Sequence, residues 1–424
     1  MKALQFVKPP KKADGQGSPE SDVRKRIDRL SDHELLKAAN AYFAGMTPDS
    51  IQYKKPFSDP VASPTLIRNL GTLLQAADLF RGARVLDFGC ATGWLSLGMA
   101  QMGCDVIGVD IAPSALRLAK RLKSRRRVES DGRMEFHAYD GRRLPVDDES
   151  VDRIVCCDAF HHVRDQAFVL QEFARVLRDG GRAAFLEPGP RHSGTVEAQT
   201  EMTRYKVIEN DISLPSIGEM AAAAGLEAPE VLVQFQQPQR LSLEEFTSWS
   251  SKGIDGKRAK VLMQTLLNQL TDTQCFYIRK GSERSDSRQL ASLGGRLRML
   301  SLEAETVGGA PGMTFRIVLC NTGSGQWLAE RAGSGQVRLG IQLLAGDGGV
   351  LNLDYARFDL DVSSVQPGQE IVVDGVFRLP PQDDYMLRFD LVSERVAWFA
   401  QHGKSAPLDL TSRELKEKAF PETS

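Results

Sequence analysis

The sequence predicts a doubly wound α/β unit with a mostly parallel sheet, followed by an antiparallel β-sandwich. Apolar, strand-like runs alternate with amphipathic helical runs over residues 84–186, which is typical of a parallel sheet covered by helices on both faces. Beyond residue 281 the helical periodicity disappears, and short β-rich runs alternate with turns that contain Gly or Pro. A length of 424 residues suits two or three such domains.

Capping residues and apolar periodicity predict the elements of the α/β unit. Ser31 and Asp32 predict the start of a first helix, and Pro113 lies in the first turn of a later one. The uninterrupted apolar run 151–157 is typical of a central parallel strand. Asp179-Gly180-Gly181 predicts the end of a helix. In chain order we expect a strand over 84–88, a helix over 93–102, a strand over 105–110, a helix over 113–126, strands over 134–139 and 151–157, a helix over 166–177 and a strand over 182–186.

The pattern loosens after residue 188. We expect a helix over 216–224, a strand over 231–235, a helical stretch around 243–270 and a strand over 275–279. The strands expected in the sandwich are 297–304, 314–321, 337–344, 371–379 and 385–392. The predicted domains are a disordered leader over 1–30, an α/β domain over 31–281, a polar linker over 282–292, the sandwich over 293–410 and a tail over 411–424.

Composition excludes several classes of protein. The formal net charge is -1, from 54 basic and 55 acidic side chains, so no overall field would gather nucleic acid. None of the six cysteines forms a C-x-x-C pair, so we predict neither disulfides nor a metal site. No run has the length of a membrane span or the pattern of a signal peptide, so the expected location is the cytoplasm.

The residues that carry chemistry follow the ends of successive predicted strands. The first strand runs into a glycine-containing turn and then a helix, an arrangement that aims backbone N–H groups at a ligand. Asp87 stands where a nicotinamide-binding turn would have its first glycine, and its carboxylate suits a ligand with a cationic amine. Asp110 ends the second strand, where an acid can accept hydrogen bonds from both ribose hydroxyls. Asp140 and Asp158 follow the third and fourth strands.

This stretch resembles motif I of the class I S-adenosylmethionine (SAM)-dependent methyltransferases, through Asp87, Gly89 and Gly93, although Ala91 replaces a usual glycine. The similarity spans residues 80–190 strongly and continues weakly to 280. It implies a Rossmann-like fold with SAM as the cofactor: Asp87 and Gly89 near its methionine moiety, Asp110 at the ribose, and Asp140 with Gly141 at the adenine. The cofactor-binding residues expected from this resemblance are Asp87, Phe88, Gly89, Cys90, Gly93, Asp110, Ile111, Asp140, Gly141 and Asp158.

Methyl transfer to a hydroxyl needs a group that takes the acceptor's proton. The candidates for catalysis are His161, His162, Glu187 and His192, all beyond the fourth and fifth strands. A single histidine here can equally cap a helix or orient a neighbour. The segment 201–211, with Tyr205, Glu209 and Asp211, is either a wall of the acceptor site or a solvated linker helix. Residues 53–57 are a candidate lid over the donor.

The C-terminal part resembles immunoglobulin-like modules found on enzymes and exporters of bacterial surface-polysaccharide synthesis. The resemblance implies a sugar, glycan or nucleotide-sugar acceptor and polysaccharide-assembly proteins as partners. Trp327, Trp398 and Phe399 would then stack on sugar rings, or else fill the core of the sandwich. Two alternatives stay open: a methyltransferase for a small lipid or quinone-like acceptor, and a non-catalytic SAM-binding scaffold.

Overall fold

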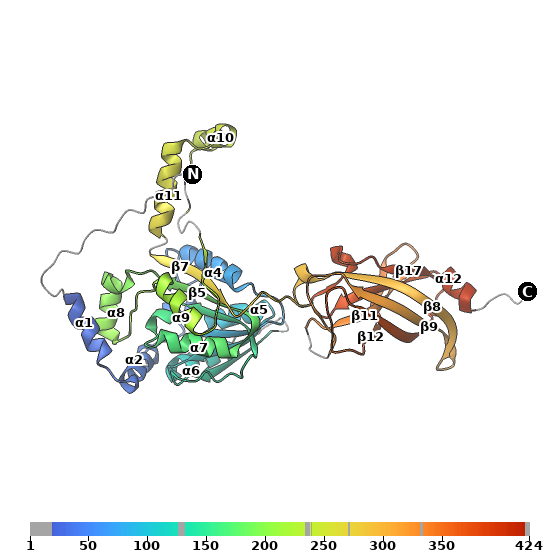
Figure 1. Ribbon diagram of the computed structural model, residues 1–424, viewed down its shortest axis with the longest axis horizontal. Coiled ribbons are helices and arrows are strands. Elements are labelled where there is room, and N and C mark those ends of the chain that lie inside the picture. The colour runs from blue at the N-terminus through green and yellow to red at the C-terminus, as the bar shows by residue number, and fades with distance from the viewer. Residues whose placement is uncertain are drawn as a thin grey trace, which may run out of the picture.

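The computed structural model describes residues 19–125, 132–233, 238, 240–269, 272–330 and 334–419. Its first unit contains a seven-stranded sheet with the order β3-β2-β1-β4-β5-β7-β6 (Figure 1). Strands β1 to β5 are parallel, whereas β7 and β6 are antiparallel additions at one edge. The predicted doubly wound, mostly parallel sheet is therefore confirmed. The strand bounds are β1 Arg84–Phe88, β2 Asp105–Asp110, β3 Arg133–Ala138, β4 Val151–Cys157, β5 Leu177–Pro188, β6 Glu230–Leu232 and β7 Thr273–Arg279.

Helices cover both faces of this sheet because neighbouring residues of each strand point to opposite sides. Val85 of β1 packs with α4, α5 and α6 on one face. Leu86, the next residue, packs with α7 and α9 on the other face. The helix bounds of this unit are α1 Pro19–Asp28, α2 Asp32–Ala44, α3 Ile51–Lys54, α4 Ser63–Ala77, α5 Trp94–Gln101, α6 Pro113–Arg125, α7 Gln166–Val176, α8 Val196–Tyr205, α9 Leu214–Ala223, α10 Leu243–Lys252 and α11 Gly256–Gln269.

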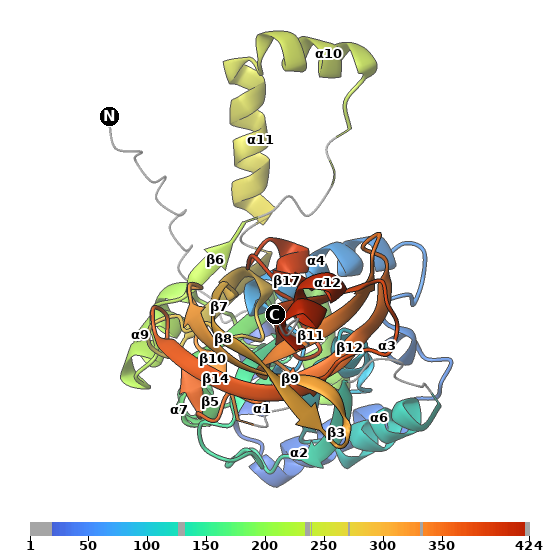
Figure 2. The ribbon, with the colours of Figure 1, turned by 90° about the vertical axis from the view of Figure 1, so that its right-hand side faces the viewer.

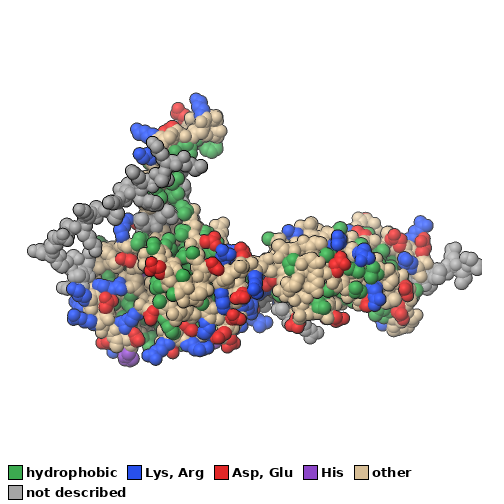
Figure 3. Space-filling view, viewed as in Figure 1, with side chains coloured by type: hydrophobic (Ala, Val, Ile, Leu, Met, Phe, Trp, Pro, Cys, Tyr) green, Lys and Arg blue, Asp and Glu red, His purple; other side chains and the backbone are tan. Residues whose placement is uncertain are grey.

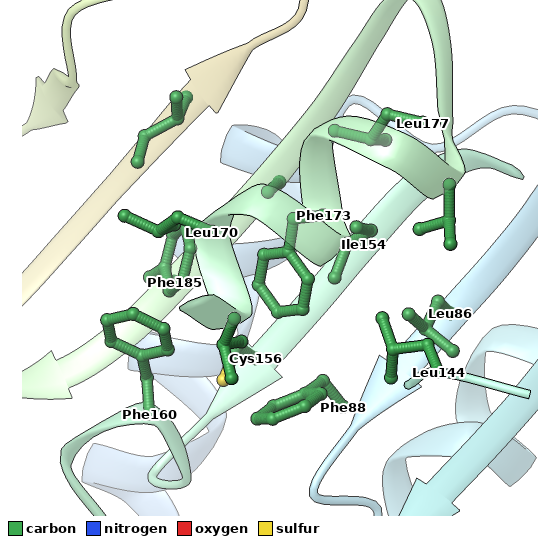
Figure 4. Close-up of a cluster of buried hydrophobic side chains, with 14 of the residues drawn as sticks. Leu86, Phe88, Leu144, Ile154, Cys156, Phe160, Leu170, Phe173, Leu177 and Phe185 are labelled. Carbon is green, nitrogen blue, oxygen red and sulfur yellow. The ribbon is translucent and has the colours of Figure 1, made fainter. Parts of the chain in front are cut away.

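An aromatic core supports the strand ends on the α7 face (Figure 4). Phe173 of α7 meets Phe88 edge-on with 5.1 Å between ring centroids, and Phe160 meets Phe185 edge-on at 5.2 Å. These rings are almost completely buried. Because Phe160 directly precedes the paired histidines, this core fixes the backbone from which both imidazoles project.

The second unit is the predicted antiparallel sandwich. One sheet has the order β14-β9-β8, and the other has the order β12-β11-β15-β16 with β17 also paired to β15. A short β10-β13 pair lies beside them. The strand bounds are β8 Gly295–Val307, β9 Ala310–Asn321, β10 Trp327–Leu328, β11 Val337–Ala345, β12 Val350–Phe358, β13 Ser364–Val365, β14 Glu370–Arg378, β15 Tyr385–Ser393, β16 Ala397–Trp398 and β17 Leu408–Thr411.

The prediction of a disordered leader is wrong for residues 19–28, which form helix α1; residues 1–18 lie outside the described part. Ile27 is buried against Met202 and Ile208. The Arg24 guanidinium donates to the Glu209 carbonyl at 2.8 Å. Tertiary contacts of this kind order a polar segment that its composition alone does not.

Helix α7 agrees with the predicted range 166–177, whereas the start of the next strand and the helical stretch 243–270 differ from the prediction. The helix before Asp179 ends at Val176, and β5 already begins at Leu177 and includes the Asp-Gly-Gly sequence. The helical stretch 243–270 is two helices, α10 and α11, separated at Gly253. These two helices stand away from the sheet unit (Figure 2) and expose large apolar side chains such as Leu243 and Phe246.

The aromatic residues considered for sugar stacking lie in the sandwich core. Trp327 and Phe399 are fully buried and contact each other edge-on, and Trp398 is 6% exposed. The alternative interpretation, as core residues, is therefore the one that the structure supports. The predicted tail contains helix α12, Ser412–Ala419, whose Leu415 is buried in the same core.

A buried ion pair ties the segment that leads into the sandwich to the sheet unit, at the edge where the parallel strands begin. The same segment is held to the sandwich, because the Ser393 hydroxyl of β15 donates to the Ser287 carbonyl. Asp152, the second residue of β4, accepts two hydrogen bonds of 2.9 Å from the Arg288 guanidinium. It also accepts the backbone N–H of Arg84, the first residue of β1, at 2.8 Å. The Arg288 guanidinium lies 4.8 Å from the ring centroid of Phe80. Figure 3 shows the two units side by side, with acidic and basic side chains interspersed on the visible face.

Candidate functional site

The acids and histidines singled out in the sequence gather at the opposite edge, where the parallel strands end. Strand pairing places Phe88 beside Val109 and Asp110 beside Ala138. It likewise places Cys157 beside Leu186, so the loops after β1, β2, β4 and β5 adjoin one another. Ligands of open α/β sheets bind at this edge.

The turn between β1 and α5 needs its glycine. Gly89 has a φ of 70°, and an added Cβ would lie 2.5 Å from the Cβ of Ala159 in the loop after β4. Only a residue without a side chain fits such a close approach. Ala91 has a φ of 47° and Gly93 a φ of 77° immediately before α5. The departure from the usual glycine at Ala91 is accommodated in the left-handed region at some cost in strain.

Two buried carboxylates lie beneath this turn. Asp87 accepts a hydrogen bond of 2.5 Å from the Ser96 hydroxyl. Burial raises the pKa of Asp87 to about 7, and the charge of Asp110 adds to this effect. Asp110 accepts the backbone N–H groups of Ala91 at 2.9 Å and Ala112 at 2.8 Å. Burial raises its pKa to about 6.

The remaining predicted cofactor residues occupy the rim or the core. Asp140 is exposed and accepts the backbone N–H groups of Arg142 and Arg143. Ile111 is 37% exposed. Phe88 and Cys90 are buried, so they offer a ligand their backbone rather than their side chains. Three further predicted residues lie on the rim or in its turns: Gly93, Gly141 and Asp158.

The N-terminal helices lie against this edge. The Thr92 hydroxyl donates to the Gln52 carbonyl of α3 at 2.9 Å, and the Lys55 ammonium is 6.0 Å from the ring centroid of Trp94. The Tyr53 hydroxyl is buried without a hydrogen-bond partner among the described residues. Helix α3 therefore contacts the glycine turn through Gln52, and the segment 53–57, considered as a lid, contributes a buried hydroxyl that a ligand could satisfy.

Glu187 organises the loop after β4. It is completely buried, and its carboxylate accepts the backbone N–H groups of Ala159 at 3.1 Å and Phe160 at 2.9 Å. It also accepts the His161 backbone N–H at 3.2 Å and lies 2.6 Å from His161 Nδ1. These contacts outweigh the effect of burial and hold the pKa of Glu187 below its ordinary value. Glu187 is thus in position to orient His161, but the protein separates it from solvent.

A second carboxylate, Glu209, gathers three histidines. His192 Nε2 lies 2.6 Å from Glu209 Oε2, and His161 Nε2 is 3.5 Å from the same oxygen. His162 Nδ1 is 3.5 Å from Glu209 Oε1 and 2.6 Å from the Ile208 carbonyl. Burial alone would lower the pKa of His161, but its hydrogen bond and ion pair with Glu187 raise it. The four residues His161, His162, His192 and Glu209 are called the histidine cluster below.

The structure brings the predicted histidines together, but Glu209 had been placed only in a candidate acceptor wall. Its signal in the sequence was its position within the polar segment 201–211. Nothing in that segment indicates that, of its three acids, Glu209 is buried while Glu201 is half-buried and Asp211 is exposed. The helix α8 and its C-terminal turn at Lys206 carry Glu209 back against the loop after β4.

Comparison with known proteins agrees with this geometry. A protein-family model, described as a methyltransferase domain, matches residues 86–185. Over 210 residues the chain is 31% identical to methyltransferase GfsG of Streptomyces halstedii, covering 46% of this chain and 73% of that protein. The chain belongs to the methyltransferase family.

Other relatives of this methyltransferase match a smaller share of their own length. The 27-O-demethylrifamycin SV methyltransferase of Amycolatopsis mediterranei is 32% identical over 166 residues, covering 37% of this chain and 59% of that protein. The ubiquinone biosynthesis O-methyltransferase of Xanthomonas euvesicatoria is 32% identical over 121 residues, covering 28% and 47%. This chain therefore spans about half the length of these two relatives. A solved phosphoethanolamine N-methyltransferase 2 of Haemonchus contortus, in complex with SAM, has 18% identity and a TM-score of 0.38, covering 61% of this chain and 60% of that one.

No helix among the described residues is long and apolar enough to cross a bilayer.

Proposed function

We propose that this methyltransferase transfers the methyl group of SAM to a hydroxyl group of a small organic acceptor. The observation that carries the proposal is the shared sheet edge. The glycine turn after β1 and the acid after β2 lie beside the loop that presents the histidine cluster. One edge therefore offers groups for a cationic nucleotide and groups for an acceptor's proton.

SAM is the methyl donor, and the residues beneath the glycine turn fit its parts. Asp110 can accept hydrogen bonds from the ribose hydroxyls, and Asp87 complements the cationic methionine end. Gly89 leaves room for close backbone approach. Asp140 and Gly141 lie where the third strand ends, beside the second, which suits the adenine. When bound, SAM supplies a methyl group that its positively charged sulfur already activates.

The protein must align the acceptor oxygen with that methyl group and receive the hydroxyl proton. Alignment accounts for roughly 7–11 kcal/mol in well-oriented reactions. Among the histidine cluster, His162 is the most accessible, with 41% of its side chain exposed against 7% for His161. We therefore assign the contact with the acceptor to His162. His161, held by Glu187, is a positioning residue.

The class of acceptor follows from the relatives' names and from the position of the sandwich. The names of two relatives specify O-methyltransfer or demethylrifamycin methylation, which favours a small-molecule hydroxyl. The predicted glycan acceptor loses two supports, because the proposed stacking aromatics are buried and the sandwich joins the opposite edge of the sheet. A sugar hydroxyl stays within the proposed class. Recruitment of polysaccharide-assembly proteins by the sandwich stays a prediction.

The division into domains is also a proposal. We place the catalytic unit within residues 31–281, extended at its N-terminus by α1, and the sandwich within 293–419 to include α12. Deleting residues 290–424 should spare SAM binding, measured by calorimetry. A truncated protein that folds but loses SAM would contradict this division.

The proposed function is tested with methyl-labelled SAM and a panel of phenols, quinols, polyol macrolides, sugars and nucleotide sugars. We expect labelled product from at least one hydroxyl acceptor, and His162→Ala should lower its kcat by roughly 10²–10⁴-fold. The SAM affinity of this variant should stay unchanged. His137→Ala, which removes an exposed imidazole on β3, is the matched control and should keep full activity. SAM binding without transfer to any acceptor would instead favour a non-catalytic scaffold.

A further inference from the structure

Glu209 is a buried carboxylate with an unsatisfied oxygen. Its side chain is 3% exposed, and Glu209 Oε1 has no hydrogen-bond partner among the described residues. A buried charged oxygen without a partner is costly, and in native proteins it calls for an explanation such as a bound water or ion or a catalytic role. His162 Nδ1 lies 3.5 Å from Glu209 Oε1.

The spacing around Glu209 matches that of a metal site. One ring nitrogen each of His161 and His162 and one oxygen of Glu209 lie within 4.8 Å of one another. Tetrahedral zinc, with bonds of about 2.0–2.1 Å, holds its ligand atoms roughly 3.3 Å apart. His161 Nε2 lies 3.5 Å from Glu209 Oε2, close to this value, and His162 Nδ1 lies 3.5 Å from the other oxygen, Oε1. His162 Nδ1 donates a hydrogen bond to the Ile208 carbonyl at 2.6 Å, so binding of the ion through this nitrogen requires the loss of that proton and that bond. His192 Nε2, 2.6 Å from Glu209 Oε2, is near enough to become a further ligand.

The surroundings of His161 are those of a metal-bound imidazole. Its Nδ1 lies 2.6 Å from the buried Glu187 carboxylate, while its Nε2 faces Glu209. Metal-binding histidines commonly donate their second N–H to a carboxylate in this way, which fixes the ring and strengthens the ligand. The carboxylates of Glu187 and Glu209 lie on the two sides of the His161 ring, and one protonated imidazole neutralises only one of these two negative charges.

We propose that His161, His162 and Glu209, with His192 as a further ligand, bind a divalent transition-metal ion such as Zn²⁺. Imidazole nitrogens with one carboxylate suit zinc, cobalt or nickel rather than magnesium. The exposed face of His162 gives the ion a path from solvent. With the ion bound, His162 is a metal ligand and no longer a free base. If the proposed function holds, the ion itself lies where the acceptor hydroxyl arrives and would favour its ionised form. Binding of the ion does not itself depend on that function.

The test uses the full chain after removal of metal by a chelator. Titration with Co²⁺, followed by visible absorption, and with Zn²⁺, followed by calorimetry, should each show one equivalent bound. Glu209→Gln and His162→Ala should each weaken Zn²⁺ binding at least 10-fold. Glu187→Gln, which removes the charge beside His161, should weaken it about 10-fold or more. His137→Ala is the control and should bind as the unaltered chain does.

SAM affinity, measured on the same samples, shows whether each variant is folded. If the folded chain binds neither ion, or if Glu209→Gln and His162→Ala bind Zn²⁺ as tightly as the control, the metal site is overturned. Metal binding without methyl transfer would leave the site standing and count against the proposed function. Methyl transfer by a chain that binds no metal would support the proposed function and overturn the metal site.

Discussion

Asp87 and Asp110 place two ionisable oxygens close to where a cationic donor would bind. Burial raises the pKa of Asp87 to about 7 and that of Asp110 to about 6. Both pKa values are higher in the folded protein than in the unfolded chain, so the protonated carboxyls favour folding. This stabilisation is complete below the unfolded value of about 4 and is lost as pH rises through 7. A cationic ligand has the opposite preference, because it interacts favourably with the ionised form.

SAM affinity should therefore rise with pH. Between pH 5.5 and pH 8 the Kd, measured by calorimetry, should fall and then level off above pH 7, with a change of up to ~10-fold per pH unit per proton released. Asp87→Asn cannot ionise and should flatten the upper part of this dependence. An affinity that is independent of pH in the unaltered chain would contradict the position assigned to Asp87.

Asp110 offers a second test of the donor site. Asp110→Asn keeps the size of the side chain and one acceptor oxygen but removes the charge, so SAM binding should weaken about 10–100-fold, as expected for hydrogen bonds to a charged group. Asp105→Asn, at the exposed opposite end of β2, is the matched control and should bind normally. Equal affinities of the two variants would refute the ribose assignment.

Residue identities were more predictable than residue environments. The strand-turn-helix pattern located Asp87, Gly89 and Asp110, because each has a fixed position relative to a strand end. The pairing of Glu187 with His161 and of Glu209 with His192 depends on distant segments meeting, so their spacing along the chain carries no signal of it. Burial of Trp327 was undecided for the same reason, since aromatic side chains serve both cores and binding surfaces.

At the scale of elements, the turn after β1 and the loop after β4 are packed too closely for any side chain at position 89. Gly89→Ala combines a positive φ with a contact of 2.5 Å to Ala159 Cβ. We expect a loss of more than about 2 kcal/mol in the free energy of unfolding, together with weaker SAM binding. Gly348→Ala, at a φ of 89° with no atom within 4 Å of the added Cβ, should lose only about 1–2 kcal/mol.

A second substitution separates the two causes. Ala159→Gly removes the opposing Cβ, so adding it to Gly89→Ala should recover the part of the loss that comes from the contact. Denaturant unfolding of the three variants measures this coupling. If the double variant is no more stable than expected from independent effects, the two loops do not press on each other there.

Elements with strong local signals were predicted closely, whereas elements fixed by packing were not. Ser31 caps α2 with both hydrogen bonds of a capping box, as the sequence indicated. The helix predicted over 166–177 is α7, which ends at Val176, but Asp179-Gly180-Gly181 lies inside β5, in a register shift between its pairings with β4, rather than in a helix cap. α1 is ordered by Met202 and Ile208, far along the chain, so its polar composition predicted disorder.

At the scale of the whole molecule, the Asp152–Arg288 pair joins the two units. Burial alone would raise the pKa of Asp152, but the charge and hydrogen bonds of Arg288 hold it below the ordinary value. Arg288→Ala would leave a buried carboxylate with only Arg178 and the Arg84 N–H, so we expect a loss of about 2–3 kcal/mol in denaturant unfolding. Arg316→Ala removes an exposed pair with Asp374 and should lose less than about 1 kcal/mol.

Acid should act on the same pair. The pKa of Asp152 is depressed by folding, so its stabilising effect is complete above the unfolded value of about 4 and disappears as pH falls through the folded value. The difference in unfolding free energy between the unaltered chain and Arg288→Ala should therefore be constant from pH 5 to pH 7 and shrink below pH 4. A difference that stays constant into strong acid would show that the pair contributes through packing alone.

The position of this pair separates the sandwich from the candidate functional site by the length of β4. Asp152 and Asp158 mark the two ends of β4, and six steps of about 3.3 Å separate them by ~20 Å. An acceptor group bound at the sandwich would have to cross at least this distance to reach the methyl group. Removal of the sandwich should therefore leave the methylation of short acceptors unchanged.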